Sequence, residues 1–248
     1  MRVGRSDRRI RRRPDLHGHG SPRVYLTGPC MVEKAQNKSS AVMAQRKEPS
    51  SSLDNFPTPP WATRALLSQC LKDYDMSALH CLEPACGAGH MAEAQKEYFK
   101  TVTASDIHPY GYGAVKDFLG PGNEYEKVDW VITNPPFRLA EDFISKGLEL
   151  ADVGIAMLTR TVFLESIGRY NRMFSKNPPT IVAQFSERVP MVKGRLDKRA
   201  STATGYAWMI WEKGSSSDFP RLSWISPCRR HLERVEDYDE RVSSNVKI

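Results

Sequence analysis

The stretch Val128–Phe137, VDWVITNPPF, decides how this chain is interpreted. Its first six residues form an apolar run with the length of a buried strand, and its last four follow directly at the strand end. Those four offer one amide side chain, one rigid carbonyl and one aromatic ring. Such a set can bind an amino group on a planar base and hold the base by stacking. We therefore interpret Asn134, Pro135, Pro136 and Phe137 as candidate catalytic residues.

A glycine-containing turn lies upstream of this stretch. Gly87 and Gly89 fall where a predicted strand over residues 79–83 turns into a predicted helix over 91–99. The absence of Cβ there lets a ligand approach the backbone closely. Asp106 ends the next predicted strand, 19 residues past Gly87, where a carboxylate can accept hydrogen bonds from both hydroxyls of a ribose. The spacing predicts a nucleotide-like cofactor at this turn.

Two other interpretations compete for the turn. Gly87-x-Gly89-x-x-Ala92 satisfies a loose dinucleotide fingerprint, which would imply NAD, and a purely structural turn is also compatible with it. Glu83 favours a sulfonium with an amino-acid ammonium group, because a carboxylate attracts these cations and would repel a pyrophosphate. The other candidate cofactor contacts from the same reasoning are Pro84 and Ala85 in the turn, and Asp117 and Phe118 for an adenine amino group and ring.

Methyl transfer to an exocyclic amine would use both motifs. The lone pair of such a nitrogen is delocalised into the ring, and two acceptors that bind its two N–H groups localise it. The side-chain oxygen of Asn134 and the carbonyl of Pro135 would be those acceptors, the prolines stiffen the segment, and Phe137 would stack on the base. A base in a duplex reaches such a pocket only by flipping out of the stack. A simple Asn-Pro turn after a buried strand is the alternative.

Predicted strands and helices alternate from residue 58 onward. Thr58 is expected to cap a helix that begins at Pro59. The later predicted strands cover residues 102–106, 128–133, 153–159, 181–189 and 203–211, with helices over 139–150 and 164–174 and a possible short strand before Asp117. This alternation favours a mostly parallel α/β sheet with helices on both faces and an antiparallel ending.

Positive charge is concentrated at the N-terminus. Residues 1–50 hold 12 Lys and Arg against 4 Asp and Glu, which leaves 24 basic and 25 acidic residues of the totals of 36 and 29. We expect residues 1–50 to be a disordered basic leader, because they have little apolar surface to bury. A non-specific phosphate-binding arm, or translation from Met31 or Met43, are alternatives. Residues 51–226 are the predicted catalytic domain, and 227–248 a charged tail or helix.

Composition excludes several classes of protein. The five cysteines are widely spaced and include no C-x-x-C pair, so neither a zinc site nor a disulfide framework is indicated. No apolar stretch approaches the roughly 20 residues of a membrane-spanning helix, and the N-terminus lacks the apolar region of a secretory signal. We expect a cytoplasmic protein without a metal. The oligomeric state stays open, with a monomer expected.

A basic cluster lies between the last two predicted strands. Lys193, Arg195, Lys198 and Arg199 fall within seven residues, in a loop expected at the catalytic edge. There they would hold the phosphates beside a flipped base, with ordinary solvated loop charge as the alternative. Arg160, just past a predicted strand, is a further candidate phosphate contact.

The order of these motifs resembles that of amino-group-specific adenine DNA methyltransferases, most of all the small enzymes of phages and prophages. The matching motifs are Phe56-x-Thr58-Pro59, the turn at 83–89, Asp106 and the NPPF segment at 134–137, and the similarity spans roughly residues 54–226. The resemblance implies S-adenosylmethionine as methyl donor and a Rossmann-like sheet of seven strands with an antiparallel last strand. It also implies that Phe56 and Thr58 help to close the cofactor pocket and that residues 134–137 hold the target base.

Two departures from the family pattern stand out. Phe137 replaces the more frequent Tyr, and no sizeable target-recognition domain is expected after the sheet. The implied activity is methylation of the N6 amino group of adenine in DNA. An RNA adenine-N6 methyltransferase, a protein glutamine N5-methyltransferase and a non-catalytic cofactor-binding relative are the alternatives.

Overall fold

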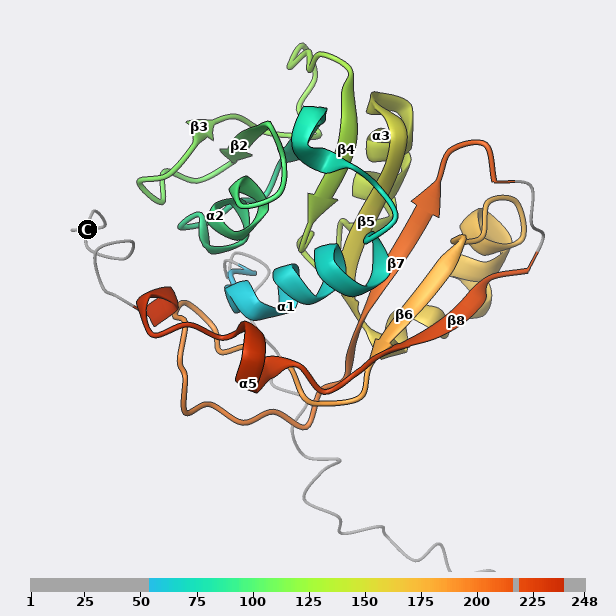
Figure 1. Cartoon of the computed structure of the whole chain (residues 1–248). Coiled ribbons are helices and arrows are strands. Elements are labelled where there is room, and N and C mark those ends of the chain that lie inside the picture. Colours follow the sequence, from blue (N-terminus) through green and yellow to red (C-terminus); the bar gives the residue numbers. More distant parts are fainter. Residues whose placement is uncertain (1–53, 216–218, 239–248) are drawn as a thin grey trace, which may run out of the picture. The chain divides into compact units, whose positions relative to one another are not determined.

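A computed structural model describes residues 54–215 and 219–238 of the chain (Figure 1). The chain divides into two units, residues 1–50 and 51–248, and every described residue belongs to the second. The expected basic leader, with both alternative start sites, lies outside the described residues. The predicted tail is described only as far as residue 238.

One sheet forms the centre of the described unit. Its strands are β1 His80–Glu83, β2 Thr101–Asp106, β3 Ala114–Val115, β4 Val128–Thr133, β5 Ala151–Arg160, β6 Ile181–Phe185, β7 Tyr206–Glu212 and β8 Arg221–Ile225. They lie in the order β3-β2-β1-β4-β5-β7-β6-β8. Strands β1 to β5 pair in parallel, β7 is antiparallel to both β5 and β6, and β8 is parallel to β6.

The mostly parallel sheet with an antiparallel β7 confirms the predicted fold class, but the sheet has eight strands instead of seven. The additional strand β8 was not predicted. Its five residues lie at the sheet edge, where Leu222 and Trp224 are exposed while Ile225 is buried. A half-exposed edge strand has only a short alternating pattern, which is a weak signal in sequence.

Helices cover both faces of the sheet (Figure 1). They are α1 Pro60–Ala65, continued by a π-helical turn η2 Leu66–Cys70, then η3 Met76–Ala78, α2 His90–Lys96, α3 Ala140–Leu150, η4 Thr161–Leu164, α4 Ile167–Arg169, η5 Tyr170–Phe174, α5 Arg229–Leu232 and η6 Glu236–Tyr238. Side chains of α1, η2 and α2 belong to the hydrophobic cluster on one face. Side chains of α3, η4 and η5 belong to the cluster on the other.

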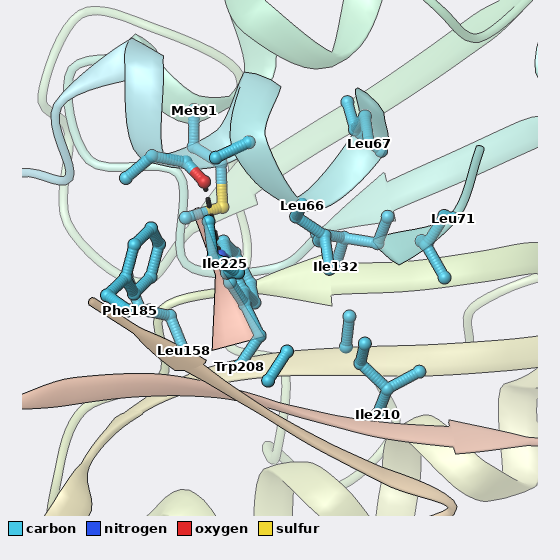
Figure 2. Close-up of a cluster of buried hydrophobic side chains, with 14 of the residues drawn as sticks. Leu66, Leu67, Leu71, Met91, Ile132, Leu158, Phe185, Trp208, Ile210 and Ile225 are labelled. Atoms are coloured by element: carbon cyan, nitrogen blue, oxygen red, sulfur yellow. Dashed lines mark hydrogen bonds between the residues drawn. The ribbon is translucent and has the colours of Figure 1, made fainter. Parts of the chain in front are cut away.

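The first cluster joins the N-terminal helix to the middle of the sheet. Figure 2 shows Leu66 and Leu71 beside the sheet residues Ile132 and Ile210. Trp208 of β7 is fully buried, and its indole N–H donates to the carbonyl of Ala62, 3.2 Å away. Burial of these large apolar side chains fixes α1 on the sheet and therefore fixes the segment that precedes α1.

Two local predictions are wrong. Helix α1 begins at Pro60 with Pro59 at its N-cap, and no side chain caps it, so Thr58 is not the cap. The helix predicted over residues 164–174 is instead the series η4, α4 and η5. Ser166 interrupts it with a φ of 125°, the one positive φ of a non-glycine residue among those described.

No helix in the described ranges is long and apolar enough to cross a bilayer.

Candidate active site

The two motifs lie at the same edge of the sheet. Strands β1 and β4 are parallel neighbours, with Cys81 opposite Trp130 and Leu82 opposite Val131. The glycine turn follows β1 and the NPPF segment follows β4, so both leave the carboxyl edge side by side. The strand order reverses between β1 and β4, and such a switch point is where open α/β sheets bind ligands.

The amide of Asn134 is held in one orientation. Its Nδ2 donates to the carbonyl of Phe56 at 3.0 Å and to Oγ1 of Thr58 at 3.1 Å, and Sδ of Met191 lies 3.7 Å away. A backbone carbonyl can only accept, so the atom that faces Phe56 must be the nitrogen. Oδ1 of Asn134 is buried and has no hydrogen-bond partner among the described residues. The site therefore presents one bare acceptor.

The aromatic end of the motif is fixed from two sides. The backbone N–H of Phe137 donates to Oδ2 of Asp54 at 2.6 Å, and the ring of Phe56 lies 5.6 Å from that of Phe137 between centroids. The guanidinium carbon of Arg160 lies 3.8 Å from the centroid of the Phe137 ring. Arg160 thus lies at the carboxyl edge of the sheet, but it stacks on the ring predicted to hold the base, and its phosphate contact stays a prediction.

The glycine turn needs backbone that only glycine adopts freely. Gly87 has a φ of 51° and Gly89 a φ of 88°. A Cβ on Gly89 would lie 2.4 Å from the ring of Tyr112. The carboxylate of Asp106 braces the turn, because its Oδ2 accepts from the N–H of Gly87 at 2.9 Å. Its other oxygen accepts from the N–H of His108 at 3.0 Å, and each oxygen keeps acceptor capacity for the predicted ribose contact.

A buried carboxylate lies beneath the turn. Glu83 is 2% exposed, and its Oε2 has no hydrogen-bond partner among the described residues. Burial raises the pKa of Glu83 well above its ordinary value, and the negative charge of Asp106 raises it further. A buried carboxyl oxygen without a partner fits a cationic ligand, because such a ligand would supply the missing partner and would favour the ionised carboxylate over the protonated form.

The other predicted cofactor contacts lie in the core and in two turns. Phe118 is 1% exposed and packs in the core, 4.9 Å from Phe143 and 5.3 Å from Tyr125 between ring centroids. Asp117 accepts from the N–H of Leu119 at 2.9 Å in a turn after β3. Pro84 and Ala85 lie in the turn itself, buried and half-buried. The adenine contacts of Asp117 and Phe118 stay predictions.

The basic loop between β6 and β7 reaches the same edge. The N–H of Gly194 donates to the carbonyl of Asn55 at 2.8 Å, and Met191 contacts Asn134. Its four predicted phosphate contacts, Lys193, Arg195, Lys198 and Arg199, are all exposed. Arg195 pairs with Asp197 at 3.0 Å, and the ammonium of Lys198 lies 5.7 Å from the ring centroid of Tyr238. These cations are therefore accessible beside the site, and their contact with nucleic acid stays a prediction.

Residues 54–58, called the strap below, link the parts of the site. Asp54 holds Phe137, Phe56 and Thr58 hold Asn134, and Asn55 holds the basic loop. Oδ1 of Asn55 also lies 3.7 Å from the point where a Cβ on Gly87 would be. Sequence reasoning identified two of these residues and missed Asp54, Asn55, Met191 and Tyr112. No motif marks them, because their roles come from contacts over long chain separations.

The part of the chain that the structure describes has no group of three or more His, Cys, Asp or Glu side chains that could hold a metal ion. Cys70, Cys81, Cys86 and Cys228 are free thiols.

Comparison with known proteins identifies solved structures with a similar fold. No family model matches the sequence, and no curated protein matches it. A solved structure named as a candidate RNA methyltransferase from Pyrococcus horikoshii aligns over 67% of this chain and 90% of its own, with 18% identity and a TM-score of 0.51. A modification subunit of a candidate type I restriction enzyme from Vibrio vulnificus covers 78% of this chain and 54% of its own, at 14% identity and a TM-score of 0.49. A dimethyladenosine transferase from Plasmodium falciparum covers 64% and 63%, at 14% identity and 0.44.

At such identities the likeness concerns architecture and not activity. The first of these structures, which exceeds a TM-score of 0.5, aligns over 90% of its own length with 67% of this chain. Together with the strand order, it shows that the described unit has a Rossmann-like fold.

Proposed function

We propose that this protein transfers a methyl group from S-adenosylmethionine to the N6 amino group of adenine in DNA. The observation that carries the proposal is the bare Oδ1 of Asn134, buried at the edge where β1 and β4 end. An isolated buried acceptor is costly unless a ligand completes it. A group that donates hydrogen bonds, such as an exocyclic amine, fits it.

The residues of the turn fit the proposed cofactor. The two left-handed glycines leave the backbone open to a ligand, and Asp106 lies behind them with acceptor capacity for hydroxyl groups. Oε2 of Glu83 has no partner among the described residues and would take the cation, which would favour the ionised carboxylate. When bound, S-adenosylmethionine would supply an electrophilic methyl group on a sulfonium.

The residues on the β4 side would then act on the acceptor nitrogen. Oδ1 of Asn134 would accept one N–H of the amine and the carbonyl of Pro135 the other, which localises the nitrogen lone pair. The prolines reduce the ordering that remains when substrate arrives, so the acceptors are already placed. Phe137 would stack on the base. The nitrogen becomes acidic once it is alkylated, so its proton can leave to water without a strong base from the protein.

DNA is the preferred substrate on the motif resemblance, and RNA is the second candidate. The RNA assignment is favoured by the solved structure from Pyrococcus horikoshii, which is named as a candidate RNA methyltransferase. The exposed cations of the basic loop suit either polymer, because phosphate contacts carry no sequence information.

The test is incubation of the full chain with radiolabelled S-adenosylmethionine and, separately, duplex DNA, total RNA and a protein extract. Mass spectrometry then identifies the modified group. We expect N6-methyladenine in DNA. Label in RNA or on glutamine amides would redirect the proposal, and label in none of them would end it.

The variant Asn134→Ala connects the activity to the site. We expect kcat to fall by about 10²–10³-fold, as when a positioned polar group is lost, with cofactor affinity unchanged by calorimetry. Asn177→Ala is the matched control, because this exposed amide precedes β6 at the opposite edge of the sheet. Normal turnover by Asn134→Ala would show that the reacting site is elsewhere.

A further inference from the structure

Thr58 has a hydroxyl group that its local sequence does not employ. It lies one position before Pro59, the N-cap residue of α1, and no side chain caps this helix. Thr58 is 4% exposed, and its Oγ1 instead accepts from Nδ2 of Asn134, which lies 76 residues away in the sequence. The hydroxyl is therefore committed to the site and not to the helix.

Asn134 has two amide hydrogens, and the strap supplies an oxygen acceptor for each. The carbonyl of Phe56 takes one at 3.0 Å and Oγ1 of Thr58 the other at 3.1 Å. The Phe56 carbonyl decides which end of the amide faces the strap, because an oxygen in that place would face another acceptor. One bond alone would still let the amide plane swing about it. The second bond, to Thr58, fixes the plane and with it the position of Oδ1.

We propose that Thr58 is a positioning residue for the transfer reaction, acting through the amide of Asn134. This inference rests on the proposed function of the site and adds to it. The pair of bonds turns Oδ1 away from the strap and leaves it as the atom of the amide without a hydrogen-bond partner among the described residues, so the site favours a group that donates a hydrogen bond. Because the strap also precedes α1, the rigid helix core holds the acceptors in place.

The matched pair Thr58→Val and Thr58→Ser separates this role from packing. Valine keeps the shape of threonine and loses the acceptor, whereas serine keeps the acceptor and loses the methyl group. Thr58→Val leaves one buried N–H of Asn134 with only the weak sulfur acceptor of Met191, 3.7 Å from Nδ2, so the amide turns and Oδ1 moves. We expect kcat to fall about tenfold, the effect of one hydrogen bond, while the cofactor dissociation constant stays unchanged. Thr58→Ser should recover most of kcat.

A second measurement does not depend on turnover. The side-chain amide protons of Asn134 can be identified by NMR as the pair that disappears in Asn134→Ala. In the unmodified protein and in Thr58→Ser, both protons should be protected from exchange with solvent. In Thr58→Val, one should lose its protection and shift.

The outcomes distinguish the two proposals. If the unmodified protein methylates nothing while the amide protons behave as expected, the proposed function fails and the positioning of Asn134 by Thr58 stands. If Thr58→Val keeps both protons protected and keeps kcat, the inference is overturned. It is also overturned if Thr58→Val weakens only cofactor binding, because Thr58 would then serve the cofactor directly.

Discussion

At the scale of one residue, Glu83 is a buried carboxyl group with one oxygen that has no hydrogen-bond partner among the described residues. The negative charge of Asp106 lies next to it. Burial and the neighbouring charge both raise its pKa well above the ordinary value of a glutamate. The folded protein therefore holds a proton that the unfolded chain releases once the pH exceeds about 4.3.

The raised pKa of Glu83 predicts how the stability of the protein changes with pH. Between the unfolded pKa of Glu83 and its raised folded pKa, the native state binds more protons, so the free energy of unfolding falls as pH rises. Glu83→Gln removes this dependence, so in urea unfolding curves the free energy of unfolding should fall less steeply above about pH 4.3 than in the unmodified protein. Glu93→Gln is the control. Burial raises the pKa of Glu93, but its hydrogen bonds with Lys96 and Tyr112 outweigh burial and lower the pKa below its ordinary value. The stability that Glu93 contributes is therefore lost only as the pH falls below the pKa of Glu93 in the unfolded chain. An unchanged pH slope in Glu83→Gln would contradict this account.

The glycine turn can be tested at the scale of one element. Gly89 and Gly122 both have left-handed backbone, with φ of 88° and 76°, so alanine at either position costs about 1–2 kcal/mol of backbone strain. A Cβ at Gly122 meets nothing within 4 Å, whereas at Gly89 it lies 2.4 Å from the ring of Tyr112. We expect Gly89→Ala to lose a further 1–3 kcal/mol or so of stability and to abolish cofactor binding by calorimetry, unlike Gly122→Ala. Equal effects of the two variants would show that the ring moves aside without cost.

Elements that depend on local pattern were predictable, and those that depend on distant partners were not. The apolar run of β4 was predicted over 128–133, as observed, because a buried central strand has a continuous apolar sequence. The helix predicted after residue 164 fails at Ser166, whose backbone conformation leaves no trace in residue type. The shared edge of the two motifs was also predictable, because parallel strands bring their carboxyl ends together. Of the strap, only Phe56 and Thr58 were predicted from the sequence. Asp54 and Asn55 were not, because each acts through a single hydrogen bond to a residue far away in the chain.

At the scale of the whole described unit, a buried ion pair and a hydrogen bond hold the segment 229–238 against helix α1. Arg64 of α1, with a side chain 5% exposed, pairs with Asp237 at 2.8 Å and with Glu97 at 2.8 Å, and also donates to the carbonyl of Leu232. Burial lowers the pKa of Arg64, but the hydrogen bonds with both carboxylates raise it above its ordinary value. No pattern in the sequence indicates a pair 173 residues apart.

This ion pair gives a prediction about stability. Arg64→Met leaves the buried Asp237 without the positive charge that pairs with it, and we expect a loss of about 3–5 kcal/mol in the free energy of unfolding. Arg234→Met is the control, because Arg234 pairs with Glu97 while its side chain is 47% exposed, and such a pair contributes at most about 1 kcal/mol. Denaturant unfolding measures both. Similar small losses would mean that the C-terminal segment is held by packing instead of charge.

The antiparallel strand β7 has an evolutionary consequence. Because β7 runs opposite to β6, the connection between them leaves and re-enters the sheet at one edge, and its part beyond Gly194, residues 195–204, holds three of the four exposed cations. Lengthening such a connection costs little, since each doubling of a flexible loop adds only about 0.6 kcal/mol. Lineages can therefore exchange residues 195–204, and with them the proposed phosphate contacts, while the strap and the two motifs at the ends of β1 and β4 are inherited intact.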